Sequence, residues 1–174
     1  MNECWTCRKE FSFEDSNFSK IFRFFVIETP IETSSARSIY LKERKINKTA
    51  LNKKIKSLSN ELKYNWNPIF GDINNVEPNI VVNSLKEGLG IDDNHDKYYT
   101  EFAYFITKKN KETETFFYCI RCAFAHGAFC IHKKNNLKYY YFENTHIQGD
   151  KIIFGRFIIN EENLLKIIDY CNSK

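Results

Sequence analysis

Apolar residues recur at the spacing of an amphipathic helix in three stretches before residue 110. Over 16–28 they form a continuous stripe, over 47–65 they fall at i, i+4, i+7 and i+11, and over 96–108 they recur three or four residues apart. Each pattern predicts a helix, and Ser16 or Asn17 is expected to cap the first. A shorter helix is predicted over 79–87, ended by a glycine, Gly88.

The helical pattern is strongest in the stretch that ends at Gly127. Its apolar residues recur on one side, which is expected to face the core: Phe116, Ile120, Ala123 and Phe124. Gly127 is suited to the left-handed conformation that ends a helix. Only the turn 108–111 separates this helix from the one over 96–108, so we predict that the two form an antiparallel hairpin.

After Gly127 the apolar residues alternate with a period of two, as in strands. Three strands joined by short turns are predicted, over 128–132, 137–143 and 152–159. Asn160 then caps a final amphipathic helix. The predicted fold is therefore mainly α: an antiparallel helical bundle with a small antiparallel β-meander inserted before the C-terminal helix.

Length and composition indicate one globular domain. The chain has 174 residues, of which 43% are hydrophobic and 16% aromatic, and its net charge of +4 permits an RNA partner without requiring one. It contains no apolar run of about 18 residues and no signal-peptide pattern, so we expect no membrane association and a cytoplasmic location. The single domain is divided into an N-terminal arm, the bundle, the meander and the C-terminal helix, over 1–15, 16–126, 128–159 and 161–171.

Two Cys-x-x-Cys pairs could together hold zinc: Cys4 with Cys7, and Cys119 with Cys122. The two pairs are much further apart in the chain than in a compact zinc ribbon, and the second pair lies inside the predicted helix. Small, partly buried thiols are the preferred interpretation, and a redox role is a further alternative. We therefore expect no metal and no cofactor.

Arg121 and His126 are the residues of the motif helix that could carry chemistry. A buried arginine requires an anion or another partner. A histidine at the negative end of a helix favours its protonated form. Five residues on a regular helix are offset by roughly 140° and about 7.5 Å. If the helix unwinds at His126-Gly127, however, the imidazole could swing back toward the guanidinium, and the two cations would suit a phosphate.

This stretch resembles the R-x4-6-H motif of the HEPN superfamily, most specifically from Arg121 to Phe129. Cys122 stands where that family usually has a polar residue, often Asn. The resemblance implies a metal-independent endoribonuclease of the type found in toxin–antitoxin and phage-defence systems. Family ribonucleases typically pair two protomers, so a homodimer with a composite site is expected. In it, His126 would transfer protons during attack of the 2′-OH, and Arg121 would stabilise the phosphate.

Other basic residues could hold the RNA backbone, and the candidates are Lys133, Lys134 and Arg156. Two rival functions remain open. One is a HEPN-like module without catalysis that binds RNA, a nucleotide or a protein. The other is an interaction subunit that is silenced by, or serves, a cognate antitoxin. The chain has no Walker A, GxGxxG or HExxH motif.

Overall fold

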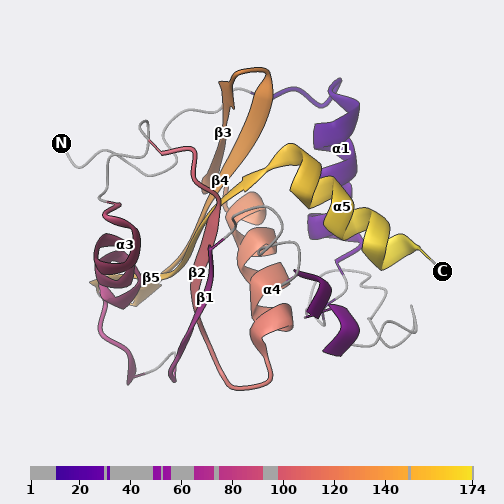
Figure 1. The fold of residues 1–174 in the computed structure, drawn as a ribbon. Coiled ribbons are helices and arrows are strands. Elements are labelled where there is room, and N and C mark those ends of the chain that lie inside the picture. Colours follow the sequence, from indigo (N-terminus) through magenta and orange to yellow (C-terminus); the bar gives the residue numbers. More distant parts are fainter. Residues whose placement is uncertain are drawn as a thin grey trace.

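The computed structural model of the protein describes residues 11–29, 31, 49–51, 53–55, 65–72, 75–91, 98–148 and 150–173. Within these ranges, five strands form one mixed sheet in the order β1-β2-β5-β4-β3 (Figure 1). The strands are β1 (Asn65–Phe70), β2 (Phe102–Thr107), β3 (Phe129–Lys134), β4 (Leu137–Gln148) and β5 (Asp150–Asn160). β1 is parallel to β2, and the other neighbouring pairs are antiparallel.

This sheet shows that the predicted fold class, a mainly α helical bundle, is wrong: the protein has an α/β fold. The largest error falls on 96–108, predicted as a helix, where 102–107 form the strand β2. All six residues of β2 are buried, because this central strand is covered on both faces. Such a strand reads as a continuous apolar run, which periodicity alone does not distinguish from a buried helix. The predicted helical hairpin is therefore a strand followed by a helix.

The helix predicted over 47–65 is only partly confirmed. Residues 49–51 and 53–55 are helical, and 56–64 lie outside the described residues. Asn65 already belongs to β1, which the sequence did not predict. β1 contains Pro68, which is tolerated because β1 lies at the edge of the sheet. The stretch 16–126, predicted as a bundle, thus contributes two strands to the sheet.

One helix, α3 (Ile80–Leu89), connects β1 to the parallel strand β2 and covers one face of the sheet (Figure 1). The prediction that Gly88 ends this helix is wrong, because the helix ends at Gly90, which has φ +66°. Gly88 instead allows close packing: a Cβ there would lie 2.6 Å from the hydroxyl oxygen of Tyr104. The smallest residue therefore lets α3 approach the sheet.

The opposite face of the sheet is covered by α1 (Ser16–Phe22), α4 (Glu112–Ala125) and α5 (Glu161–Asn172) (Figure 1). α1 continues into a π-helical turn, η1 (Arg23–Ile27). Asp15, rather than Ser16 or Asn17, caps α1, and its side chain accepts the N–H groups of Asn17 and Phe18.

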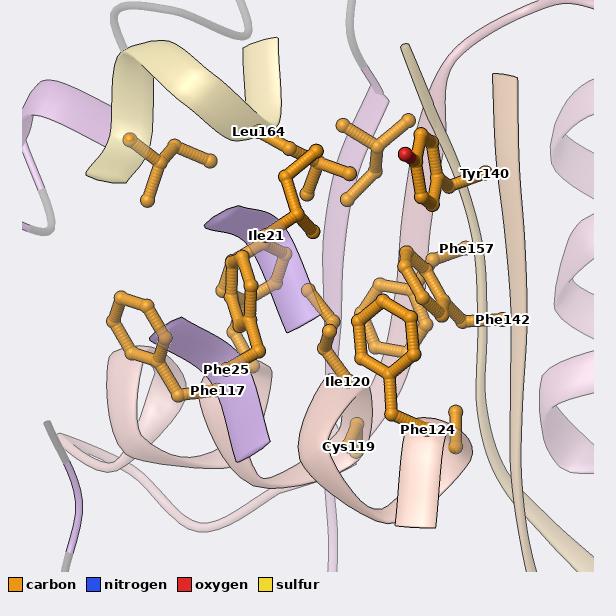
Figure 2. Packing of buried hydrophobic residues seen from close by; sticks show 14 of the residues in the cluster. Ile21, Phe25, Phe117, Cys119, Ile120, Phe124, Tyr140, Phe142, Phe157 and Leu164 are labelled. Carbon is orange, nitrogen blue, oxygen red and sulfur yellow. The ribbon is translucent and has the colours of Figure 1, made fainter. Parts of the chain in front are cut away.

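The larger core lies between these helices and the sheet. Figure 2 shows Ile120 and Phe124 of α4 turned toward Phe142 and Phe157 of the sheet, with Ile21 and Phe25 on the left of Ile120, the side away from these two rings. Fully burying one such side chain contributes about 1.5–3 kcal/mol. The core therefore fixes the orientation of α4 and thus the direction of its polar side.

The three predicted C-terminal strands are present, but they extend the main sheet instead of forming a separate meander. β3 and β4 are joined by a two-residue turn, Asn135-Asn136, in which both residues have positive φ, as tight hairpins require. Asn160 caps α5 as predicted, and its side chain accepts the N–H of Asn163 at 2.8 Å.

Candidate functional site

The helix that carries Arg121 and His126 ends as the sequence predicted. His126 is the C-cap residue of α4, and Gly127 follows it with φ +65°. The N–H of Gly127 donates to the carbonyl of Phe124 at 3.1 Å, and the N–H of Ala128 donates to that of Ala123 at 2.8 Å. This hydrogen-bond pattern is a Schellman motif. It leaves the His126 side chain exposed at the end of the helix.

Arg121 lies half-buried on α4, beside Tyr118 and Cys122. Burial raises the pKa of the Cys122 thiol, and the neighbouring Tyr118 hydroxyl and Arg121 guanidinium offset only part of that rise. The hydrogen bond with Cys122, together with partial burial, raises the pKa of Tyr118 to about 12. These three residues therefore form one local cluster on α4.

The backbone keeps Arg121 and His126 on different sides of α4. The helix is regular to Ala125, and His126 is its C-cap, with φ −93° and ψ 2°, outside the α-helical region. Their offset is therefore still roughly 140° around the axis and about 7.5 Å along it. The helix does end at His126-Gly127, as the sequence predicted, but the two positions already lie on different sides of it before that point. The composite site between two protomers stays a prediction.

The three basic residues suggested for RNA contact have different environments. Lys133 and Lys134 are exposed in β3, with the Lys134 Nζ 4.3 Å from the centre of the Tyr99 ring. Arg156 is buried in β5, and its Nε and one terminal nitrogen donate to Glu143 Oε2, each at 2.9 Å. A buried arginine in a salt bridge has a structural role, and Arg156 is therefore not exposed for contact with RNA.

Of the two Cys-x-x-Cys pairs, one lies in the described residues and the other, Cys4 and Cys7, lies outside them. Cys119 and Cys122 are buried in α4. Burial raises the pKa of Cys119 to about 12, although Asn144 donates a hydrogen bond to its sulfur at 3.4 Å. Zinc binds thiolates, which such burial disfavours. Across the part of the chain that the structure describes, no three His, Cys, Asp or Glu side chains gather as metal ligands.

A pocket that the sequence did not predict lies where β2 ends and α4 begins. We call it the carboxyl-edge pocket. Its volume is about 350 Å³, and it is lined by Ile31, Thr107, Lys108, Lys111, Glu114, Thr115 and Tyr118. Figure 1 shows the chain leaving the lower end of β2 and turning into α4 at this place. Four of its lining residues lie just before α4 or on the side of α4 that faces away from the core: Lys111, Glu114, Thr115 and Tyr118.

Polar groups in the carboxyl-edge pocket are arranged in pairs. The hydroxyl oxygens of Thr107 and Thr115 lie 2.8 Å apart. Lys111 Nζ lies 3.4 Å from Glu114 Oε1. Lys108 Nζ lies 4.0 Å from a carboxylate oxygen of Asp72, which follows β1. Both lysine side chains are more than half exposed, so these salt bridges are weak and a ligand could replace them.

The carboxyl-edge pocket also lies at a topological switch point. The chain leaves β1 toward α3 on one face of the sheet and leaves the adjacent parallel strand β2 toward α4 on the other face. In open α/β sheets, ligands bind outside the carboxyl ends of strands at such points. The sequence signal for this site was a buried strand, a Thr-Lys-Lys turn and a helix start. It could not be recognised because 96–108 was interpreted as a helix.

Neither known protein families, nor curated proteins, nor solved structures gave a match to this chain. None of the helices in the described ranges has the length and apolar character needed to cross a bilayer.

Proposed function

We propose that the protein binds a phosphate-bearing ligand in the carboxyl-edge pocket. The observation that carries this proposal is the meeting of Lys108, Lys111 and the Thr107–Thr115 hydroxyl pair at the carboxyl end of β2. Lysines are mobile point charges suited to phosphate oxygens, and hydroxyls add directed hydrogen bonds.

The hydroxyl pair can supply a donor to a ligand. The single hydroxyl hydrogen of Thr107 is donated either to the carbonyl oxygen of Lys108 at 3.2 Å or to the Thr115 hydroxyl at 2.8 Å. When Thr107 turns its hydrogen from Lys108 to Thr115, the Thr115 hydrogen is free to point toward the ligand. Glu114 opposes an anion, and so does Asp72 beside Lys108, so these four side chains carry no net charge. The exposed lysines can turn from these carboxylates to a phosphate, because an exposed ion pair is worth only about 0.2–1 kcal/mol.

Titration calorimetry with inorganic pyrophosphate at low salt tests this function. Lys111→Met should weaken binding by about tenfold, because a hydrogen bond to a charged group is worth about 1.5–3 kcal/mol. The matched control is Lys109→Met, which removes an equally exposed lysine from the same turn but not from the described lining of the pocket. Equal affinity in both variants, or no binding by the unmodified protein, would contradict the proposal.

Metal-independent cleavage of RNA is a second candidate function. The observation that favours it is the Schellman end of α4, which presents the exposed imidazole of His126 one and a half turns beyond Arg121. The helical bundle implied by the HEPN resemblance is wrong, so this candidate rests on these two residues alone. Because one chain holds them on different sides of α4, two protomers would have to face each other. A role in defence and a cognate antitoxin belong to this candidate.

Cleavage is tested with single-stranded RNA in the presence of a chelator. Arg121→Ala and His126→Ala should each abolish cleavage, and the mass in solution should be that of a dimer. His132→Ala is a matched control for a histidine outside the motif. If RNA binds but is never cut, the module without catalysis replaces the nuclease.

A further inference from the structure

Tyr118 is the aromatic residue of the carboxyl-edge pocket. Its side chain lies on α4, lines the pocket and is 47% exposed. Nucleic-acid bases stack on exposed aromatic rings of this kind. Tyr118 therefore offers a flat apolar surface beside the phosphate-binding groups.

The Tyr118 hydroxyl lies near the Cys122 thiol, one turn further along α4. Ile31, which is 5% exposed, supplies an aliphatic wall to the same pocket.

The apolar and basic groups are separated along the helix. Tyr118 follows Lys111 by seven residues, which corresponds to about 10.5 Å along the axis, and follows Thr115 by about 4.5 Å. Glu114 and Thr115, which are adjacent in the chain, lie between the two ends, and Glu114 is a hydrogen-bond acceptor. The order along α4 is therefore lysine, then carboxylate and hydroxyl, then aromatic ring. A nucleotide has its charged phosphates at one end and its base at the other, with the ribose hydroxyls between them.

We infer that the ligand of the carboxyl-edge pocket is a nucleoside diphosphate or a similar mononucleotide. Its phosphates contact Lys108, Lys111 and Thr115, its ribose hydroxyls donate to Glu114, and its base stacks on Tyr118. This inference rests on the proposed phosphate-binding function. A volume of about 350 Å³ lies within the range of small-molecule sites, about 300–1,000 Å³.

The experiment compares the affinities of ADP and inorganic pyrophosphate by titration calorimetry. We expect the unmodified protein to bind ADP about tenfold more tightly, since stacking of one base is worth about 1–3 kcal/mol. In Tyr118→Leu the ratio of the two affinities should fall to about one, whereas Tyr118→Phe should keep most of it. Phe13→Leu, which changes an exposed aromatic residue outside the described lining of the pocket, should keep the full ratio. Thermal melting checks that each variant is folded.

The possible failures can be told apart. If pyrophosphate binds but ADP is no tighter, or if Tyr118→Leu keeps the ratio, the nucleotide inference is overturned and the phosphate site stands. If neither compound binds, both proposals are overturned. If a single-stranded hexaribonucleotide binds more than tenfold tighter than ADP and Arg121→Ala removes that difference, the ligand is RNA and the mononucleotide inference is overturned.

Discussion

The hydroxyl oxygens of Thr107 and Thr115 lie 2.8 Å apart, one on the last residue of β2 and the other in the first turns of α4. Both residues line the pocket, but Thr107 is almost fully buried, whereas Thr115 is half-buried. The pair therefore fixes the start of α4 against the sheet and leaves one hydroxyl at the pocket wall.

Replacing Thr115 by Val, which has a similar shape, tests both roles of this hydroxyl. Thr107 keeps its contact with the Lys108 carbonyl, so the free energy of unfolding should fall by only about 1 kcal/mol. Pyrophosphate affinity should fall severalfold, because the donor is lost. Thr115→Ser keeps a hydroxyl and should bind like the unmodified protein. Urea denaturation and calorimetry measure the two effects, and unchanged affinity in the valine variant would exclude Thr115 from the site.

Replacing Glu114 by Gln should strengthen the binding of pyrophosphate. The change removes the carboxylate that lies 3.4 Å from Lys111, so the ammonium group is left to the ligand. Exposed ion pairs are worth about 0.2–1 kcal/mol, which corresponds to a gain of at most about fivefold. The gain should shrink as salt is added, because salt screens exposed charges. Calorimetry at two salt concentrations measures this effect, and weaker binding at low salt would show that Glu114 does not oppose the phosphate.

The sequence correctly predicted the helices and strands whose residue pattern fits only one type of secondary structure. The strands that follow Gly127 could be recognised from the short turns between them, although β4 and β5 are buried on both faces like β2. Asn160 and Gly127 are residue types that favour the ends of helices. β2 was missed because both of its faces are buried, so its apolar residues do not alternate. β1 was missed because it is a short edge strand interrupted by Pro68. These failures follow from the position of each strand in the sheet, which local sequence does not contain.

The candidate site could be predicted only where it depends on one helix. The end of α4 at His126 follows from local sequence, but the environment of Arg121 depends on the packing of the helix. The carboxyl-edge pocket combines residues from 31 to 118, and it forms only because β2 and α4 meet at the edge of a sheet. Arg156 looked like a free cation because its partner, Glu143, lies on the neighbouring strand.

The salt bridge between Arg156 and Glu143 predicts a large loss of stability on breaking it. The two side chains are 6% and 3% exposed. Arg156→Met leaves the Glu143 carboxylate buried without its cation and should reduce the free energy of unfolding by about 3–5 kcal/mol. The double variant with Glu143→Leu removes both charges and should be clearly more stable than the single variant. Urea denaturation measures both, and a single variant as stable as the unmodified protein would show that the pair is not structural.

Lys138 joins β4 to the starts of two helices. Its ammonium group bonds to Asp15, the cap of α1, and to Glu161 of α5. The hydrogen bond from Lys138 lowers the pKa of Asp15 below its ordinary value of 3.8. Burial alone would lower the pKa of Lys138, but its bonds with Asp15 and Glu161 outweigh burial and raise that pKa above 10.5.

These shifts predict how the contribution of Lys138 depends on pH. The contribution of Asp15 to the free energy of unfolding is fully present above pH 3.8 and is lost as the pH falls through the lower pKa that Asp15 has in the folded state. The contribution of Lys138 is fully present below pH 10.5 and is lost as the pH rises through the higher pKa that Lys138 has in the folded state. Lys138→Met should therefore lower the free energy of unfolding by about 1 kcal/mol between pH 3.8 and pH 10.5, and by less outside this range. Urea denaturation across this range measures the difference, and a cost that does not change with pH would contradict it.

A crystal structure of the protein grown with ADP locates the ligand itself. We predict that phosphate oxygens lie within hydrogen-bonding distance of Lys111 Nζ and Thr115 Oγ1, at the carboxyl end of β2. Nucleotide bound elsewhere on the molecule, with the carboxyl-edge pocket empty, would contradict the proposed function.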